Sequence, residues 1–130
     1  MSCTSERQQK LLNLSQTIFN RLRHDFVEWN IPISISIDHA LGFVDMSSCY
    51  AVTYQTETGF KVNVSSLLFD EYEKAPHEAI RNILAHELCH TIKGCFNHGA
   101  EWKRYVKTLN AQHGFKINPY PYTKKKTDLY

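Results

Sequence analysis

Apolar side chains recur every three or four residues near the start of the chain, which is the period of one helical face. The stripe comprises Leu11, Leu14 or Ser15, Ile18, Leu22, Phe26 and Trp29. Asn30 and Pro32 follow the stripe and are expected to end the helix. The pattern predicts a long amphipathic helix over residues 6–29, with its apolar stripe packed into the core.

In the middle of the chain the apolar period changes to two, which is typical of strands. Residues 33–38 (ISISID) alternate strictly and predict a half-buried strand with its three isoleucines on one side. Residues 50–56 and 60–66 alternate in the same way, and the short connection that contains Gly59 predicts a β-hairpin. Gly42, in the stretch before the hairpin, indicates a bulge or a close backbone approach. We therefore expect a small three-stranded antiparallel sheet.

The helical period returns after the hairpin. Residues 67–75 predict a short helical or turn segment that leads to Pro76, a residue well suited to the first position of a helix. A broad apolar face predicts a core helix over residues 76–93, and Gly94 is the expected residue after its end. A final helix is predicted over residues 99–113. Helices grouped around an antiparallel sheet place the protein in the α+β class.

The composition fits one compact domain. The chain has 130 residues, of which 42% are hydrophobic, so it can bury a core. We expect this core to span about residues 6–117 and to be followed by a Tyr/Lys-rich basic tail over about 118–130. We also expect a monomer.

Hydropathy and the cysteines indicate a location. No apolar run is long enough to cross a bilayer, so we expect no membrane association. The first residues lack the charged and apolar regions of a secretory signal, so a cytoplasmic protein with reduced thiols is expected. No two of the four cysteines form a CxxC pair, which argues against a zinc ribbon or a thioredoxin-like motif. These cysteines are Cys3, Cys49, Cys89 and Cys95.

The overall charge of +2 is the sum of an acidic and a basic part. Residues 1–98 carry a net charge of −3, whereas residues 99–130 carry +5. A basic C-terminal third is a recognised sign of an anionic partner, and it is also found on solvated helices and soluble tails. If this part binds nucleic acid, we expect weak, nonspecific and salt-sensitive binding through Lys103, Arg104, Lys107 and Lys124–Lys126.

An HExxH motif lies on the predicted core helix as His86-Glu87-Leu88-Cys89-His90. Residues four apart share a helical face, so both imidazoles can reach one metal ion. Glu87 lies beside the first histidine, where its carboxylate can act as general base and then general acid. Chance produces this motif in only about 2% of chains with this composition. It predicts a zinc-dependent hydrolase.

A catalytic zinc ion usually has three protein ligands and an open position. Gly94 lets the chain turn back, and His98 opens the next helix, so His98 is the favoured third ligand. The alternative is Glu101, one helical turn further along. Cys89 and Cys95 lie close enough in sequence to approach the metal, although buried thiols without a ligand role are more common.

Other candidate residues have structural explanations. His24, His39, His77 and His113 are expected at the surface or at helix ends. Tyr105 could donate a hydrogen bond to an oxyanion, but packing beside Trp102 is the simpler role for it.

The motif and the residues after it resemble the SprT-like zinc metalloproteases, a group that includes the Spartan-type DNA–protein crosslink proteases. The resemblance is carried by His86-Glu87-x-x-His90 followed by His98-Gly99-x-Glu101-Trp102-Lys103. It implies a minimal zincin-like domain in which His86, His90 and His98 bind one Zn²⁺ ion. It also implies that Glu87 is the catalytic base and that Trp102 is structural. The sequence given lacks the C-terminal zinc ribbon that many members carry.

The function expected from these features is peptide-bond hydrolysis by a metal-activated water, with protein or peptide substrates that include DNA-associated proteins. Two alternatives keep the metal. The first is a phosphate-ester or nucleotide hydrolase, which the basic C-terminal third would suit. The second is a nucleic-acid-binding module in which a cysteine completes a closed, structural zinc site.

Overall fold

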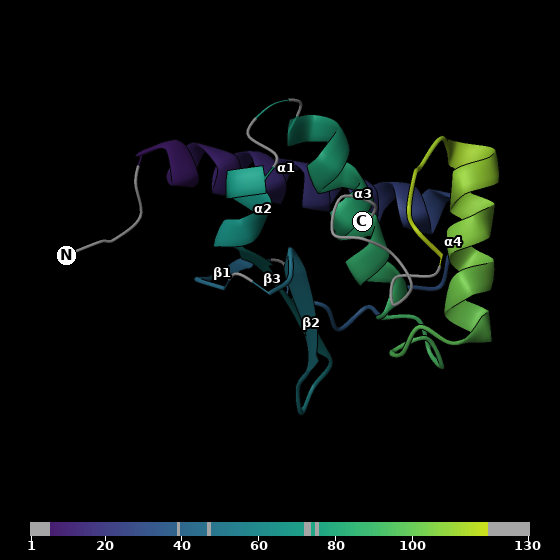
Figure 1. The fold of residues 1–130 in the computed structure, drawn as a ribbon. Coiled ribbons are helices and arrows are strands. Elements are labelled where there is room, and N and C mark those ends of the chain that lie inside the picture. The colour runs from purple at the N-terminus through teal and green to yellow at the C-terminus, as the bar shows by residue number, and fades with distance from the viewer. Residues whose placement is uncertain (1–5, 39, 47, 72–73, 75, 120–130) are drawn as a thin grey trace.

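The protein is α+β in a computed structural model that describes residues 6–38, 40–46, 48–71, 74 and 76–119 (Figure 1). Its helices in this part of the chain are α1 (Glu6–Glu28), α2 (Ser66–Glu71), α3 (Pro76–Cys89) and α4 (Ala100–His113). Its strands are β1 (Gly42–Val44), β2 (Ala51–Gln55) and β3 (Phe60–Ser65).

Helix α3 is the centre of the core. Its side chains are buried on every side from Ala79 to Cys89, apart from the half-buried Arg81. A helix that is buried all round must be enclosed by other elements, and α3 is packed against α1, β2 and α4. Helix α1 contributes Leu22 and Phe26 from its predicted apolar stripe, together with Phe19, which was not part of that stripe. The predicted limits of α1 and α4 are confirmed to within one residue at each end.

Helix α3 ends at Cys89, four residues earlier than predicted. The amides of His90 and Thr91 donate to carbonyls three residues back, which tightens the chain into a 3₁₀-type turn. The Thr91 hydroxyl also donates to the Leu88 carbonyl at 2.7 Å. Such local side-chain bonds compete with continued α-helix. Gly94 then turns the chain with a φ of +84°.

The sheet is mixed, and the prediction of an all-antiparallel sheet is wrong. The predicted hairpin forms as β2 and β3, but β1 pairs with β3 in parallel, so the strand order is β1-β3-β2. The loop from β1 to β2 therefore passes the end of β3, where Ser65 and Ser66 hold it. Their side chains contact Asp45, Met46, Cys49 and Tyr50.

Residues 33–38 do not form the predicted strand. They join the sheet only at a parallel bridge between Ile37 and Phe60, and Ile35 is 95% exposed. The third strand is instead the short β1, which begins at Gly42. A Cβ atom at Gly42 would overlap the side chain of Asn63 on β3, so the expected close backbone approach is confirmed.

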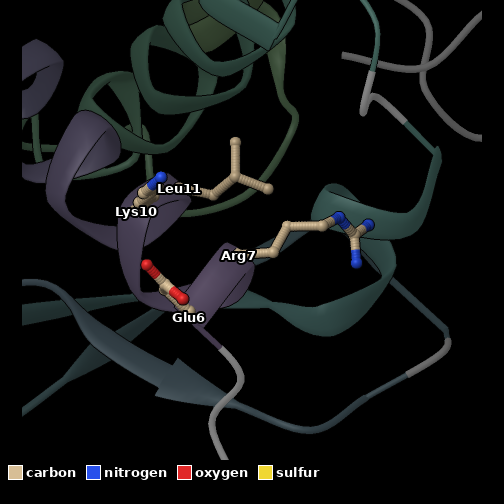
Figure 2. Close-up of a pocket in the computed structure, with 4 residues that line it drawn as sticks. All are labelled: Glu6, Arg7, Lys10 and Leu11. Carbon is tan, nitrogen blue, oxygen red and sulfur yellow. The ribbon is translucent and has the colours of Figure 1, made fainter.

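A pocket of about 430 Å³ lies at the start of α1, lined by Glu6, Arg7, Lys10 and Leu11 (Figure 2). Arg7 reaches towards α2, donating to the Phe69 carbonyl at 3.2 Å and pairing with Asp70 at 3.8 Å. The polar wall of this pocket thus ties α1 to α2. None of the helices in the described residues has the length and apolar character needed to cross a membrane.

Candidate metal centre

Three imidazoles converge where α3 ends and α4 begins. His86 lies in the last full turn of α3, His90 in the 3₁₀-type turn, and His98 in the loop before α4. Their Nε2 atoms are separated by 3.2 Å (His86–His90), 3.1 Å (His90–His98) and 3.2 Å (His86–His98). His86 and His90 are buried, and His98 is half-buried. The structure therefore assembles the three predicted histidines into one cluster.

The spacing of the three nitrogens fits a metal ion. Zinc binds imidazole at about 2.0–2.1 Å, so a tetrahedral ion separates its ligand nitrogens by about 3.3 Å. A neutral imidazole has one ring nitrogen that carries a proton and one that offers a lone pair, so each Nε2 atom can bind a metal when the proton lies on Nδ1. A cation between these nitrogens would satisfy all three lone pairs together, so the cluster could hold a metal ion.

The orientation of His90 is fixed by the turn that follows it. Its Nδ1 atom lies 3.0 Å from the carbonyl oxygen of Cys95, which can only accept a hydrogen bond. Nδ1 therefore carries the proton, and Nε2 presents a lone pair to the cluster. Metal-binding histidines commonly donate their second nitrogen in this way, which orients the ring.

Trp102, in the first turn of α4, packs against the whole cluster. Its ring lies 4.8 Å from that of His86, 5.5 Å from that of His90 and 4.7 Å from that of His98, centre to centre. It is fully buried, and its indole N–H donates to the His86 carbonyl at 3.4 Å. Trp102, which the family resemblance implies to be structural, thus packs against all three histidines of the site.

Glu87 lies next to the cluster and is buried. Its Oε2 atom is 3.7 Å from His86 Nε2, and its side chain is almost fully buried. Burial raises the pKa of Glu87 to about 8 in the metal-free chain, and a hydrogen bond from Thr53 partly offsets this rise. Ionisation of this carboxyl is thus sensitive to any positive charge beside it.

Two of the three imidazoles, those of His90 and His98, are held in the neutral form that binds metals. Burial lowers the pKa of His90. Burial also lowers the pKa of His98, to about 4, with smaller contributions from the charges of His90 and Lys103. Both rings are therefore neutral and ready to bind at neutral pH.

The structure does not bring the other candidate ligands into the cluster. Glu101 is exposed and forms a 2.7 Å ion pair with Arg104. The thiols of Cys49, Cys89 and Cys95 are free, and the metal-binding group found among the described residues contains histidines alone. Cys95 contributes its backbone carbonyl instead, through His90.

The other described histidines and Tyr105 are not part of the cluster. His24 and His77 are exposed, and His113 stacks on Trp29 at the end of α4 at a ring distance of 3.7 Å. His39 lies outside the described residues. Tyr105 packs against the core and lies under the guanidinium of Arg104, as the simpler role predicts.

One neighbour of the site was not predicted from the sequence. The hydroxyl of Thr53, on β2, donates to Glu87 Oε1 at 2.7 Å. The two residues are 34 positions apart, and nothing in the local pattern around Thr53 distinguishes it from the other polar residues of the hairpin. Only the packing of β2 against α3 brings them together.

Comparison with known families identifies the chain. The model of the SprT-like family matches residues 7–124, which is nearly the whole sequence. The protein therefore belongs to the SprT-like family, and its histidine cluster is the kind of site that a metal-dependent enzyme uses. A comparison with individually curated proteins gives no match.

The cluster predicts about one divalent metal ion per chain in the purified protein. Replacing His86, His90 or His98 with Ala should each lower the metal content, because three imidazoles are needed to hold the ion. Glu101→Ala is the matched control and should retain the metal. Mass spectrometry of the metals in acid-digested protein measures this, and undiminished metal in the three histidine variants would contradict the assignment.

The lowered histidine pKa values predict how the metal-free protein responds to acid. A histidine in the unfolded chain takes up a proton near pH 6.5, whereas His98 in the folded chain does so near pH 4. Between these values the unfolded chain binds more protons, so the free energy of unfolding falls as the pH is lowered. Glu87 has the opposite effect between about pH 4.5 and 8, because its folded pKa is raised.

This response can be measured by urea unfolding of the metal-free Glu87→Gln variant from pH 7 to pH 4. Adding His98→Gln should make the loss of stability smaller, since glutamine does not titrate. Adding the exposed His77→Gln instead should leave the loss unchanged. If Glu87→Gln and Glu87→Gln/His98→Gln lost the same stability between pH 7 and pH 4, the His98 imidazole would not stay neutral in the folded chain.

Proposed function

We propose that the protein is a zinc-dependent peptidase in which His86, His90 and His98 hold the metal and Glu87 transfers protons. The observation that carries this proposal is the convergence of three Nε2 atoms within 3.2 Å of one another, with a buried carboxylate beside them. Membership of the SprT-like family supports it independently.

The donor set favours zinc. Neutral imidazoles suit zinc better than they suit magnesium or calcium, which prefer oxygen ligands. Three protein ligands leave a fourth position open, which is typical of catalytic rather than structural zinc sites. The thiol that a closed structural site would need is absent from the cluster in the described residues. This supports an enzyme over a zinc-containing binding module.

The chemistry divides between the ion and the protein. A zinc ion at this position would polarise a substrate carbonyl and lower the pKa of water at the open position. Glu87 Oε2, which faces His86, is placed to take a proton from the attacking water. The same oxygen can then deliver the proton to the leaving amine nitrogen. The positive charge beside Glu87 would lower its pKa and keep it ionised for the first step.

The surroundings of the site suit an extended peptide. Within the described residues β2 pairs only with β3, so its other edge can take up a further strand. Tyr54 on this strand and Phe96 in the loop before His98 are 39% and 45% exposed, and offer apolar contact area. A peptide laid along β2 would pass close to Glu87, which Thr53 on the same strand contacts.

Replacing Glu87 with Gln should abolish cleavage while leaving the metal bound. Glutamine keeps the shape of the side chain but cannot accept and return a proton, so we expect kcat to fall by about 10²–10⁴-fold. Proteolysis of an unfolded protein substrate, followed by gel and mass spectrometry, measures this loss. Glu101→Gln, which changes an exposed carboxylate, is the matched control and should cleave normally.

Two outcomes would contradict the proposal. Retained cleavage in Glu87→Gln would remove the proton-transfer role of Glu87. Hydrolysis of nucleotides or phosphate esters by the metal-loaded protein, without cleavage of any protein substrate, would favour the alternative hydrolase.

We also propose that the C-terminal third binds nucleic acid weakly, which would direct the peptidase to DNA-associated proteins. Lys103 and Lys107 lie on α4, next to the segment that carries His98. Arg104 lies on the same helix and pairs with Glu101. The lysines of the tail lie outside the described residues.

Binding to duplex DNA should weaken steeply as salt increases, because phosphate contacts release counterions. Replacing Lys103 and Lys107 with Gln should reduce the slope of log affinity against log salt by about 2. Fluorescence anisotropy measures both effects, with Lys10→Gln/Lys74→Gln as the charge-matched control. An affinity that does not depend on salt would overturn this part of the proposal. So would an unchanged slope of log affinity against log salt in the Lys103→Gln/Lys107→Gln variant.

A further inference from the structure

Thr53 links the edge strand of the sheet to the carboxylate beside the histidine cluster. Its hydroxyl lies 2.7 Å from Glu87 Oε1 and 3.3 Å from the Glu87 backbone carbonyl. A hydroxyl has a single proton, and the shorter contact is the one to the side chain. The bond therefore fixes one of the two carboxylate oxygens.

The two oxygens of Glu87 consequently have different surroundings. Oε1 accepts from Thr53, whereas Oε2 lies 3.7 Å from His86 Nε2 and faces the cluster. Without the bond, the carboxylate could rotate about its last side-chain torsion, which is broad for glutamate. The Thr53 hydroxyl thus fixes the orientation of the carboxylate plane, with one oxygen bonded to β2 and the other directed towards His86.

The bond is anchored on both sides by rigid structure. Thr53 pairs in the ladder with Val62 of β3, which is fully buried. Its β-branched side chain has few rotamers, so the hydroxyl loses little freedom when it bonds. Glu87 lies on α3, which the core encloses. Because β2 and α3 are both held by the core, the hydrogen bond between Thr53 and Glu87 can keep the carboxylate in one orientation.

We infer that Thr53 is a positioning residue that holds Glu87 Oε1 so that Oε2 carries out the proton transfers. This inference rests on the proposed function for its catalytic consequence, while the contact itself can be tested without any substrate. Thr53 hydrogen-bonds to Glu87, so its effect on catalysis is exerted through the Glu87 carboxylate.

The kinetic test compares Thr53→Val, which removes the hydroxyl and keeps the shape, with Thr53→Ser, which keeps the hydroxyl. We expect Thr53→Val to lower kcat by about 10-fold with KM and metal content unchanged, because one hydrogen bond to a charged group is lost. Thr53→Ser should stay within about 3-fold of the original kcat. Thr17→Val, the same substitution on the exposed face of α1, is the matched control and should have no effect.

Three kinetic results would overturn the inference. An unchanged kcat in Thr53→Val would show that the hydroxyl is not needed. An equal loss in the valine and serine variants would indicate a packing effect. A rise in KM with an unchanged kcat would indicate that Thr53 binds the substrate.

The contact is tested separately by a double-mutant cycle on the metal-free protein. Thr53→Val and Glu87→Ala, alone and together, are compared by urea unfolding. We expect the two substitutions to be non-additive by about 5–10-fold in the unfolding equilibrium constant. Additive effects would refute the contact and the inference with it. Non-additivity in a protein that cleaves no peptide would support the contact and refute the proposed function instead.

Discussion

Three imidazole nitrogens held about 3 Å apart in a largely buried site form a group that one cation could bind, and the surrounding structure is arranged around this group. His90 presents a lone pair to this group, and His86 and His98 would have to do the same when a metal is bound. Such an arrangement persists only if the surrounding structure holds each ring in place. Much of the fold around α3 can be understood as the means of holding them.

The supports come from different parts of the chain. The turn after α3 supplies the Cys95 carbonyl that orients His90, and α4 supplies Trp102, whose ring lies against all three imidazoles. The hairpin supplies Thr53, which contacts Glu87. A cavity in place of Trp102 would therefore disturb the ligands as well as the core. Removing such a buried ring typically costs about 3–5 kcal/mol of stability.

Local periodicity was sufficient to predict the existence of α1, α3 and α4 and to select the histidines of the cluster, although not the end of α3. The apolar stripe of α1 and the spacing of His86 and His90 both depend on helical geometry, which acts over three or four residues. His98 could also be predicted from the sequence, because Gly94 marks a turn that brings the chain back towards the end of α3. The structure places His98 in the cluster and leaves Glu101 at the surface, paired with Arg104.

Features that depend on distant contacts could not be predicted in this way. Alternation indicates which face of a strand is buried, but it does not determine the partner strand or the direction of pairing. The parallel pairing of β1 with β3 depends on a loop that Ser65 and Ser66 hold at the end of β3, and Ile35 is exposed despite its alternating context. The bond from Thr53 to Glu87 likewise joins residues 34 positions apart.

The early end of α3 also has an electrostatic consequence. The backbone dipoles of a helix add up to a partial negative charge of about half an electron at its C-terminus, and the effect is confined to the last turn. Because α3 ends at Cys89, its last turn lies next to His86 and His90, and the hydrogen bonds that its last carbonyls accept reduce this charge. A helix that continued to Lys93 would have placed its C-terminus about one turn, or 5.4 Å, past them. The 3₁₀-type turn thus leaves the C-terminal turn of the central helix next to the position where a cation would bind.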